Sequence, residues 1–437
     1  MSRSFTLTAL AFSLLALPAL AQEVTPHYFN VPGTDTKLKI YGFVQMYGEY
    51  YVNQTEYMNG SLIDGYSSQT SAVAAPTNQF VMTPRTSRFG FATITPSSLG
   101  DVTTKVELDF AHDAHIYYPP TATGVSLGVG TTDQAVPRLR HLVMSFANWT
   151  FGYTWSNWLD LDAGAETVDW NGPIGQACDD TPRFTQIRYT IPFDKNNSLA
   201  ISLEENQNDG KWYAGSVADA NAVPDTKYPT VVAAYTYSDK WGHVALRGLE
   251  QYWGAYLPPT VANNSGTKTS AWAGAAQLSF SVNIMKDSLV GSIYSGKGLG
   301  AYGTDNGYDA FINVATTGLP YGPNSVQFTK STGWQAGYTH VFTDDVRANI
   351  AASGLTYTDD PFNVAANPDL ATLSDVKNSQ YYFVNCFVKL TKTVEFGIEY
   401  CYEALKTFGS QAVQDSNNNP TNKLTESKVQ FTMTATF

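Results

Sequence analysis

Acidic and aromatic residues are concentrated in one segment of this chain, residues 149–180. Arginines stand close to both of its ends, at positions 138, 140, 183 and 188. A guanidinium group can bind a carboxylate through two parallel hydrogen bonds, so this spacing favours ion pairs or the capture of a small carboxylate. The segment begins as a short strand and becomes a long loop. We expect that loop to fold inward and narrow a water-filled β-barrel, with its acids facing arginines on the wall.

The residues of this expected constriction are polar, acidic or aromatic. They are Trp155, Asn157, Asp160, Asp162, Glu166, Asp169 and Asn171.

The arginines themselves follow the strand pattern of the chain. A lipid-facing arginine near the bilayer midplane costs roughly 2–4 kcal/mol, whereas one facing water in a pore costs little. Side chains alternate between the two faces of a strand, so neighbours such as Phe89 and Ile187 facing lipid predict an arginine facing inward. On this basis the inward-facing residues are Arg88, Arg188, Arg247 and Arg347.

Four other arginines do not fit this alternation. Arg138 and Arg140 share parity with Leu142, and a β-bulge near Leu142 would let them face the lumen as well. Arg85 and Arg183 also have the opposite parity, and we expect them at the outer rim. The arginines could instead form a structural ladder that holds the loop, or some could hold the loop while others stay free for solute. Inward acids such as Glu107 and Glu399 then suggest a transverse field that orients a charged solute.

No pattern in the sequence indicates catalysis or a bound cofactor. The pair His112 and His115 has a spacing that could seat a metal, but it lacks a third ligand nearby. The glycine-rich stretch 296–300 belongs to no strand–helix unit that would bind phosphate. We therefore expect no catalytic residue, no metal and no cofactor, and the net charge of −12 does not favour nucleic acid.

The elements that must position these residues are indicated by composition. Residues 1–21 read as a signal peptide, with Arg3, an apolar run and an Ala-Leu-Ala cleavage site. Charged residues make up only 15% of the chain and aromatic residues 14%, and no later stretch is apolar for the length of a membrane helix. The remaining solution for an exported membrane protein is a closed barrel, here residues 37–437 after a periplasmic lead-in at 22–36.

The barrel prediction rests on alternation and on turns. In the last strand Val429, Phe431 and Met433 alternate with polar residues, which gives one face to lipid and one to water. Seven short turns alternate with eight long loops, which implies about sixteen antiparallel strands. We expect an all-β transmembrane barrel in a bacterial outer membrane, with short periplasmic turns and long extracellular loops.

Several motifs resemble the DcaP-like outer-membrane porins. They are VPGTDTKLKIYG at 31–42, TSRFG at 86–90, RLRH at 138–141, TWSNWLDLD at 154–162 and ETVDWNGP at 166–173. The resemblance implies a homotrimer of sixteen-stranded barrels, each with an inward third loop. It also implies passage of small anions, such as dicarboxylic or aromatic acids, past wall arginines at 88, 138, 140 and 188.

Two alternatives remain open. A general or sugar-type porin would guide neutral solutes along aromatic side chains, namely Tyr117, Tyr118, Trp155, Trp158 and Trp170. An outer-membrane hydrolase or adhesin is a further possibility, although barrel enzymes tend to have fewer strands. The expected partners are small anionic solutes, outer-membrane lipid and two further copies of the chain.

Overall fold

The computed structural model describes most of the strands and turns and part of the loops. The described residues are 28–52, 78–111, 137–168, 183–206, 211–214, 217–218, 223–257, 266–303, 310–313, 325–358, 376–409, 413–414 and 420–437.

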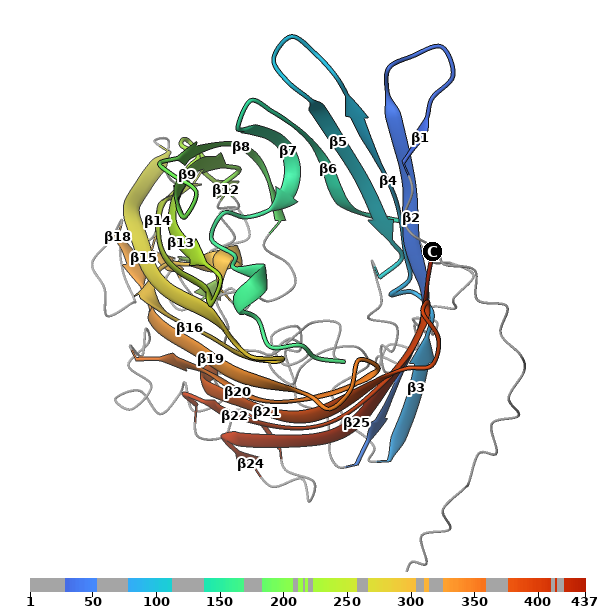
Figure 1. Ribbon diagram of the computed structural model, residues 1–437. Coiled ribbons are helices and arrows are strands. Elements are labelled where there is room, and N and C mark those ends of the chain that lie inside the picture. Colours follow the sequence, from blue (N-terminus) through green and yellow to red (C-terminus); the bar gives the residue numbers. More distant parts are fainter. Residues whose placement is uncertain are drawn as a thin grey trace, which may run out of the picture.

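Within these ranges the chain forms a closed antiparallel barrel of sixteen wall strands, which confirms the predicted fold (Figure 1). The wall consists of β2 (Lys37–Tyr51), β3 (Gln79–Thr83) continued by β4 (Arg88–Thr95), β5 (Val102–Asp109), β6 (Arg138–Phe146), β7 (Trp149–Trp155), β8 (Arg183–Pro192), β9 (Asn197–Glu204), β13 (Thr230–Asp239), β14 (Gly242–Leu257), β15 (Thr267–Ile284), β16 (Asp287–Lys297), β19 (Lys330–Val341), β20 (Val346–Tyr357), β21 (Val376–Lys389), β22 (Val394–Thr407) and β25 (Lys423–Thr436).

Each wall strand pairs with its neighbours in the chain, and the first pairs with the last. Strand β2 is hydrogen-bonded to β25 from Phe43 opposite Thr436 to Tyr51 opposite Lys428. At the seam, Gly42 and Phe437 exchange both backbone hydrogen bonds, of 3.2 and 3.0 Å. Strand β1 (Phe29–Asn30) extends the pairing of β2 beyond the last residue of β25. Closure removes the unpaired backbone groups that a bilayer cannot satisfy.

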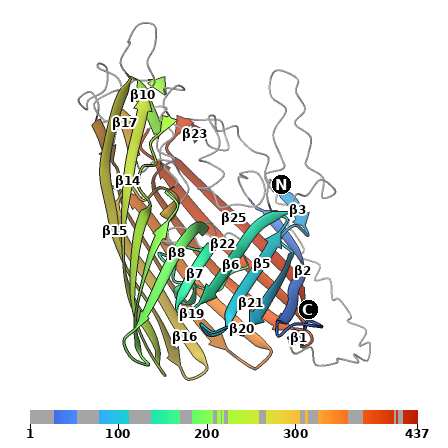
Figure 2. The same ribbon diagram turned by 90° about the horizontal axis from the view of Figure 1, so that it is seen from above.

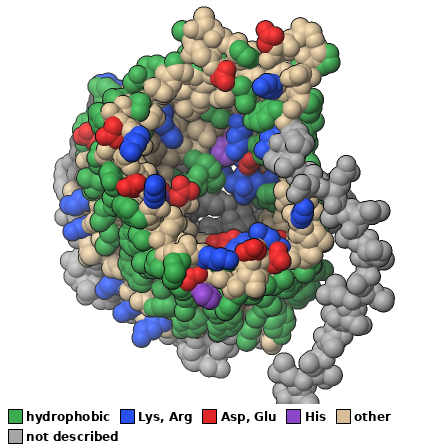
Figure 3. Space-filling view, viewed as in Figure 1, with side chains coloured by type: hydrophobic (Ala, Val, Ile, Leu, Met, Phe, Trp, Pro, Cys, Tyr) green, Lys and Arg blue, Asp and Glu red, His purple; other side chains and the backbone are tan. Residues whose placement is uncertain are grey.

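The alternation predicted for the last strand appears in β25. Gln430 is fully buried toward the inside, whereas Met433 on the other face is 40% exposed. Figure 3 shows the same division over the whole molecule, with hydrophobic side chains on much of the outer circumference and charged ones around the opening.

All seven short turns expected from the sequence are present. One of the two-residue turns joins β6 and β7, where Ala147 and Asn148 both have positive φ, of 47° and 69°. Two such residues match the twist of the flanking strands. The described parts of the long loops, such as residues 211–214 and 310–313, lie at the opposite end of the cylinder (Figure 2). Within the described residues, no helix is both long and apolar enough to cross a bilayer.

The long loops carry short strands of their own. Four of them, β10 (Lys211–Ala214), β11 (Val217–Ala218), β17 (Ala310–Asn313) and β18 (Ser325–Phe328), form a small sheet. Strand β12 (Val223–Pro224) pairs with β14, and β23 (Val413–Gln414) pairs with β24 (Pro420–Thr421).

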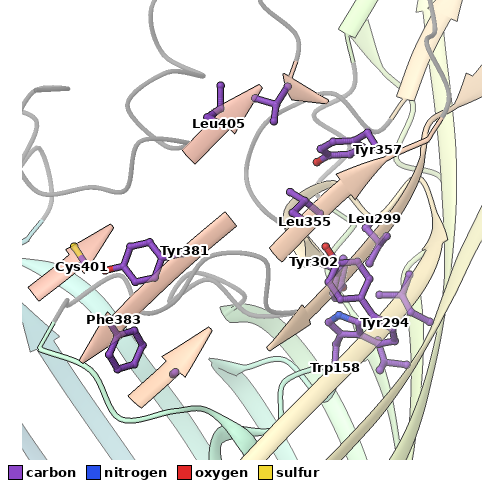
Figure 4. Close-up of a cluster of buried hydrophobic side chains, with 14 of the residues drawn as sticks. Trp158, Tyr294, Leu299, Tyr302, Leu355, Tyr357, Tyr381, Phe383, Cys401 and Leu405 are labelled. Atoms are coloured by element: carbon purple, nitrogen blue, oxygen red, sulfur yellow. The ribbon is translucent and has the colours of Figure 1, made fainter. Parts of the chain in front are cut away.

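One loop enters the barrel. After β7 the chain leaves the wall and includes the short 3-10 helix η2 (Leu161–Ala163), which lies inside the ring of strands in Figure 1. We call the described part of this segment, residues 156–168, the inner loop. Trp158 of the inner loop is fully buried in a cluster that includes Tyr294, Tyr302 and Leu355 (Figure 4). This apolar contact fixes the loop against one side of the wall.

Candidate functional site: the charged lumen

The inner loop begins at a carboxylate of the wall. Glu204 of β9 accepts a hydrogen bond of 2.7 Å from the Ser156 hydroxyl and one of 2.9 Å from the backbone N–H of Asn157. The Asn157 amide also donates to the carbonyl oxygen of Ala200, at 3.0 Å. Both carboxylate oxygens of this buried glutamate are therefore occupied by the point where the chain turns inward.

A second anchor is Asp160, which is 7% exposed. Its carboxylate accepts from Arg247 at 2.8 Å, from His243 at 3.0 Å and from the hydroxyl of Ser279. Burial acts to raise the pKa of the Asp160 carboxyl, but Arg247 and the hydrogen bonds from Ser279 and His243 outweigh it, so this pKa is lowered from its ordinary value. The carboxylate stays ionised and holds the loop to β14 and β15.

A third anchor involves Glu166 and Arg347 of β20. The guanidinium donates to Glu166 at 2.6 and 2.8 Å and to Glu395 of β22 at 2.7 and 3.0 Å. It also lies 4.6 Å from the ring centre of Phe387. One arginine therefore joins two carboxylates, each in the paired geometry that is strongest for this contact.

The described part of the loop ends on Glu399 of β22. The hydroxyl of Thr167 and the backbone N–H of Val168 both donate to this carboxylate, at 2.9 Å. Asn385 links the last two anchors, because its amide donates to the carbonyl oxygen of Glu166 and to Glu399. The loop is thus fixed along its described length to strands from β9 to β22.

The other side of the lumen carries a group of basic residues. Its geometry depends on an irregularity between β5 and β6, where Glu107 pairs with His141 but Leu108 pairs with Leu139. Arg140 is the extra residue, so Arg138, Arg140 and His141 all lie on the inner side, while Leu139 is 38% exposed outside. The bulge expected near Leu142 is therefore centred two residues earlier.

The acids of β5 hold these arginines in place. Arg138 binds Asp109 through two hydrogen bonds, of 2.9 and 2.7 Å, and Arg140 binds the same carboxylate at 2.7 Å. Glu107 lies 3.1 Å from Lys105 and 3.8 Å from Arg88 of β4. Among the described residues, these two carboxylates therefore contact four lysine and arginine side chains of the wall.

Trp155, at the start of the inward turn, connects further arginines to this group. Its ring centre lies 4.4 Å from the guanidinium of Arg183 and 5.6 Å from that of Arg140. Its carbonyl oxygen accepts a hydrogen bond of 2.5 Å from Arg188 of β8. Cations over a tryptophan face are attracted by the ring, which partly compensates their mutual repulsion.

We call this group the basic cluster. Its cations are Arg88, Lys105, Arg138, Arg140, Arg183 and Arg188. Glu107 and Asp109 form ion pairs with it, and Glu204 acts on Arg188 electrostatically.

The structure divides the residues singled out from the sequence into three sets. Arg88, Arg138, Arg140 and Arg188 belong to the basic cluster, whereas Arg247 and Arg347 anchor the inner loop. Asp162 is exposed in η2, and Asp169 and Asn171 lie outside the described residues. Arg183 is the first residue of β8 and Arg85 lies between β3 and β4, and both side chains are buried.

The signal that could have identified Arg183 is its strand partner. Trp155 and Arg183 end the pairing of β7 with β8, and an aromatic ring opposite an arginine at that position favours stacking. Trp158, which was a candidate for an aromatic track, is fully buried and offers no ring face to a solute. Among the described residues, no group of three or more histidine, cysteine or acidic side chains could hold a metal ion.

Comparison with known proteins places this lumen in context. A family model described as DcaP outer membrane protein matches residues 20–421. The solved DcaP channel of Acinetobacter baumannii is similar, with a TM-score of 0.69 and 18% identity over 94% of this chain and 99% of that one.

More distant structures share the fold. OmpT of Vibrio cholerae has a TM-score of 0.55 and 9% identity over 94% of this chain and 100% of that one. An anion-selective porin from Comamonas acidovorans has a TM-score of 0.50 and 10% identity over 92% of this chain and 100% of that one. No curated protein matches the sequence.

Proposed function

Because the chain belongs to the DcaP outer membrane protein family, we propose that this channel of the bacterial outer membrane passes small anions by passive diffusion. The solutes are small dicarboxylic and aromatic acids, and transport runs down a concentration gradient without a cofactor. The protein is a channel and not an enzyme. The inner loop narrows the path and the basic cluster selects by charge.

The observation that supports this proposal is the density of cations in the basic cluster. Among the described residues, six cations and three carboxylates interact there, and Arg88, Arg138 and Arg183 have further interactions. Where the inner loop is anchored, by contrast, each arginine meets at least one carboxylate of its own. A net positive wall beside low-dielectric protein focuses the potential in the channel and raises the local concentration of anions.

The more accessible members of the cluster are the best placed to meet a solute. The side chain of Arg88 is 34% exposed and that of Arg138 is 21% exposed, whereas that of Arg140 is 2% exposed. A carboxylate that approaches Arg88 or Arg138 can accept two hydrogen bonds in one plane. Arg140 and Arg183 are buried and do not meet the solute directly, but their charges add to the positive potential in the channel.

The decisive experiment is a reversal-potential measurement in planar bilayers across a potassium chloride gradient. We expect the wild-type channel to favour chloride, and the double variant Arg88→Gln with Arg138→Gln to lose most of that preference. A matched control is Lys286→Gln with Lys195→Gln, which removes the same charge at the periplasmic turns. Cation preference in the wild type, or equal effects of both double variants, would refute the proposal.

A sugar-type channel with little charge preference is the alternative. Block of single-channel current by maltose, with no block by succinate or phthalate, would favour it over the anion channel.

The homotrimer is a further part of the proposal. A trimer form of the similarly folded OmpT of Vibrio cholerae supports it. Native mass spectrometry of the protein extracted in mild detergent tests it, and a monomer under those conditions would refute it.

A further inference from the structure

Two pairs of lysines lie face to face on the outer surface of the barrel. Lys297 at the end of β16 is the register partner of Lys330 at the start of β19. Lys406 near the end of β22 is likewise the partner of Lys423 at the start of β25. In both cases two cations stand directly opposite each other on neighbouring strands, an arrangement that is destabilising in the absence of an anion.

The first pair belongs to the lipid-facing rows of its strands. On β16, Ile293 lies four positions before Lys297, so the two side chains share a face, and Ile293 is 50% exposed. On β19, Trp334 has the same relation to Lys330 and is 39% exposed. Directly below the pair, the hydroxyls of Ser295 and Thr332 lie 3.0 Å apart and exposed. The lysine pair therefore lies at the upper end of an apolar strip, next to two hydroxyl groups.

The second pair has the same setting. Ile398 and Tyr400 share the row of Lys406 on β22 and are 43% and 46% exposed. The Tyr400 hydroxyl lies 3.4 Å from the Ser427 hydroxyl of β25, on the row of Lys423. Each lysine pair is thus combined with lipid-exposed apolar side chains and with hydroxyl groups on the same face.

The height of the pairs matches the outer leaflet. Lys297 follows the periplasmic end of β16, at Asp287, by ten residues. With a rise of about 3.3 Å per residue and a strand tilt of about 40°, it stands about 25 Å above that end, which is the height of the apolar band. Lys406 follows Val394 at the corresponding end of β22 by twelve residues. Both pairs reach the level of the outer headgroups.

The lysines at the opposite end of the barrel are matched differently. Lys286 lies 3.3 Å from the carboxylate of Asp344, and Lys389 donates to the carbonyl oxygen of that same residue. Among the described residues, no ion pair joins any of the four upper lysines to a carboxylate. The difference is that Lys286 and Lys389 each have a hydrogen-bond partner in Asp344 within the chain, while the upper pairs set cation against cation.

We propose that each of the two lysine pairs binds a phosphate monoester on the headgroup of an outer-leaflet glycolipid. The phosphate lies between the two ammonium groups and removes their repulsion. The hydroxyl groups below the pair meet the sugar, and the acyl chains lie along the apolar strip. This surface is on the outside of the barrel and is independent of the charge preference of the channel.

The test uses the whole mature protein in phosphatidylcholine nanodiscs that contain diphosphorylated lipid A, with retained lipid counted by native mass spectrometry. We expect the wild type to retain lipid A, and Lys297→Gln with Lys330→Gln to reduce retention at least about five-fold, since each cation near an anionic lipid surface contributes measurably to binding. The variant Lys406→Gln with Lys423→Gln should show a similar reduction, and Lys297→Arg with Lys330→Arg should restore binding.

Three results would overturn the proposal. The first is equal retention of lipid A that has been stripped of its phosphates. The second is equal retention of phosphatidylglycerol, a phosphodiester, which would reduce the pairs to general anion attraction. The third is an equal loss in the control Lys286→Gln with Lys389→Gln. A heat-induced shift in gel mobility verifies that each variant forms the barrel before lipid is counted.

Discussion

The basic cluster and the anchors of the inner loop use the same residue types for different ends. At the anchors, Arg247 meets Asp160, and Arg347 meets both Glu166 and Glu395. In the basic cluster, Arg138 and Arg140 both bind Asp109, and Arg140 also lies 3.4 Å from Glu107. The first arrangement is neutral or acidic and holds a segment in place. We propose that the second leaves positive potential for the channel.

This difference teaches that the number of arginines in a lumen does not by itself indicate selectivity. An arginine that two carboxylates surround contributes rigidity, because its charge is cancelled at short range. An arginine that shares one carboxylate with others contributes to the field. The structural ladder is found at the anchors, and the anion-attracting wall that we propose lies in the basic cluster, so the two roles belong to different regions of one channel.

The largest effect that separates the regions is expected for Arg347→Gln. The substitution leaves Glu166 and Glu395 facing each other, and we expect a loss of about 2–3 kcal/mol in the free energy of unfolding in lipid vesicles. Single-channel conductance should become noisier as the loop loosens, with little change in ion selectivity. The control Glu395→Gln keeps the Arg347–Glu166 contact and should be mild. A selectivity change as large as that of a basic-cluster variant would contradict the division.

A smaller effect is expected for Asp160→Asn, which removes one anchor and frees a charge. Arg247 then lacks its carboxylate, so stability should fall by about 2 kcal/mol. Because Arg247 adds to the positive potential, the preference for chloride should increase. Reversal potentials and urea unfolding in vesicles measure the two effects. If chloride preference fell instead, Arg247 would not face the channel.

The effect of Arg138→Gln should be smaller still, and confined to selectivity. Asp109 retains Arg140 as its partner, so the barrel should keep its stability. One positive charge fewer should lower the ratio of anion to cation permeability about two-fold at low salt, and less at high salt, where screening is strong. A conservative control is Arg138→Lys, which preserves the charge and loses only the paired geometry.

The smallest effect concerns pH. The pKa of Asp160 is lowered in the folded protein, so its contribution to stability is present above the unfolded value of about 3.9 and is lost as pH falls through the folded value. In a His243→Gln background, the stability difference between Asp160 and Asp160→Asn should therefore be constant from pH 8 to about 5. A difference that already shrinks in this window would mean that Asp160 is not held by Arg247.

Much of the fold follows from local physics. Alternation of apolar and polar residues and the punctuation by turns predict the strands, because both depend only on neighbouring residues. The bulge at Arg140 is also indicated locally, since without it two arginines would share a face with Leu142. The partners of Asp160 and Glu166 could not be predicted, because Arg247 and Arg347 are 87 and 181 residues away in the chain.

Asp160 and Glu166 of the loop consequently pair with arginines on strands that are distant in the chain from β7 and β8, the strands that flank the loop. Proximity in sequence suggested Arg138, Arg140 and Arg188 as partners, but these belong to the basic cluster. The direction in which a loop crosses a cylinder depends on apolar burial, here of Trp158 among Tyr294 and Leu355. That contact joins three segments that are distant in the chain, so no short stretch of the sequence indicates it.

The seam between β2 and β25 has a consequence for assembly. Gly42 and Phe437 join the beginning and the end of the wall, so no shorter piece of this chain can complete the circle. Until β2 pairs with β25, the sheet has two edges with unpaired backbone groups. A chain that lost its last few residues would leave a slit where lipid tails meet water. The pairing of β25 with β2 therefore completes the barrel.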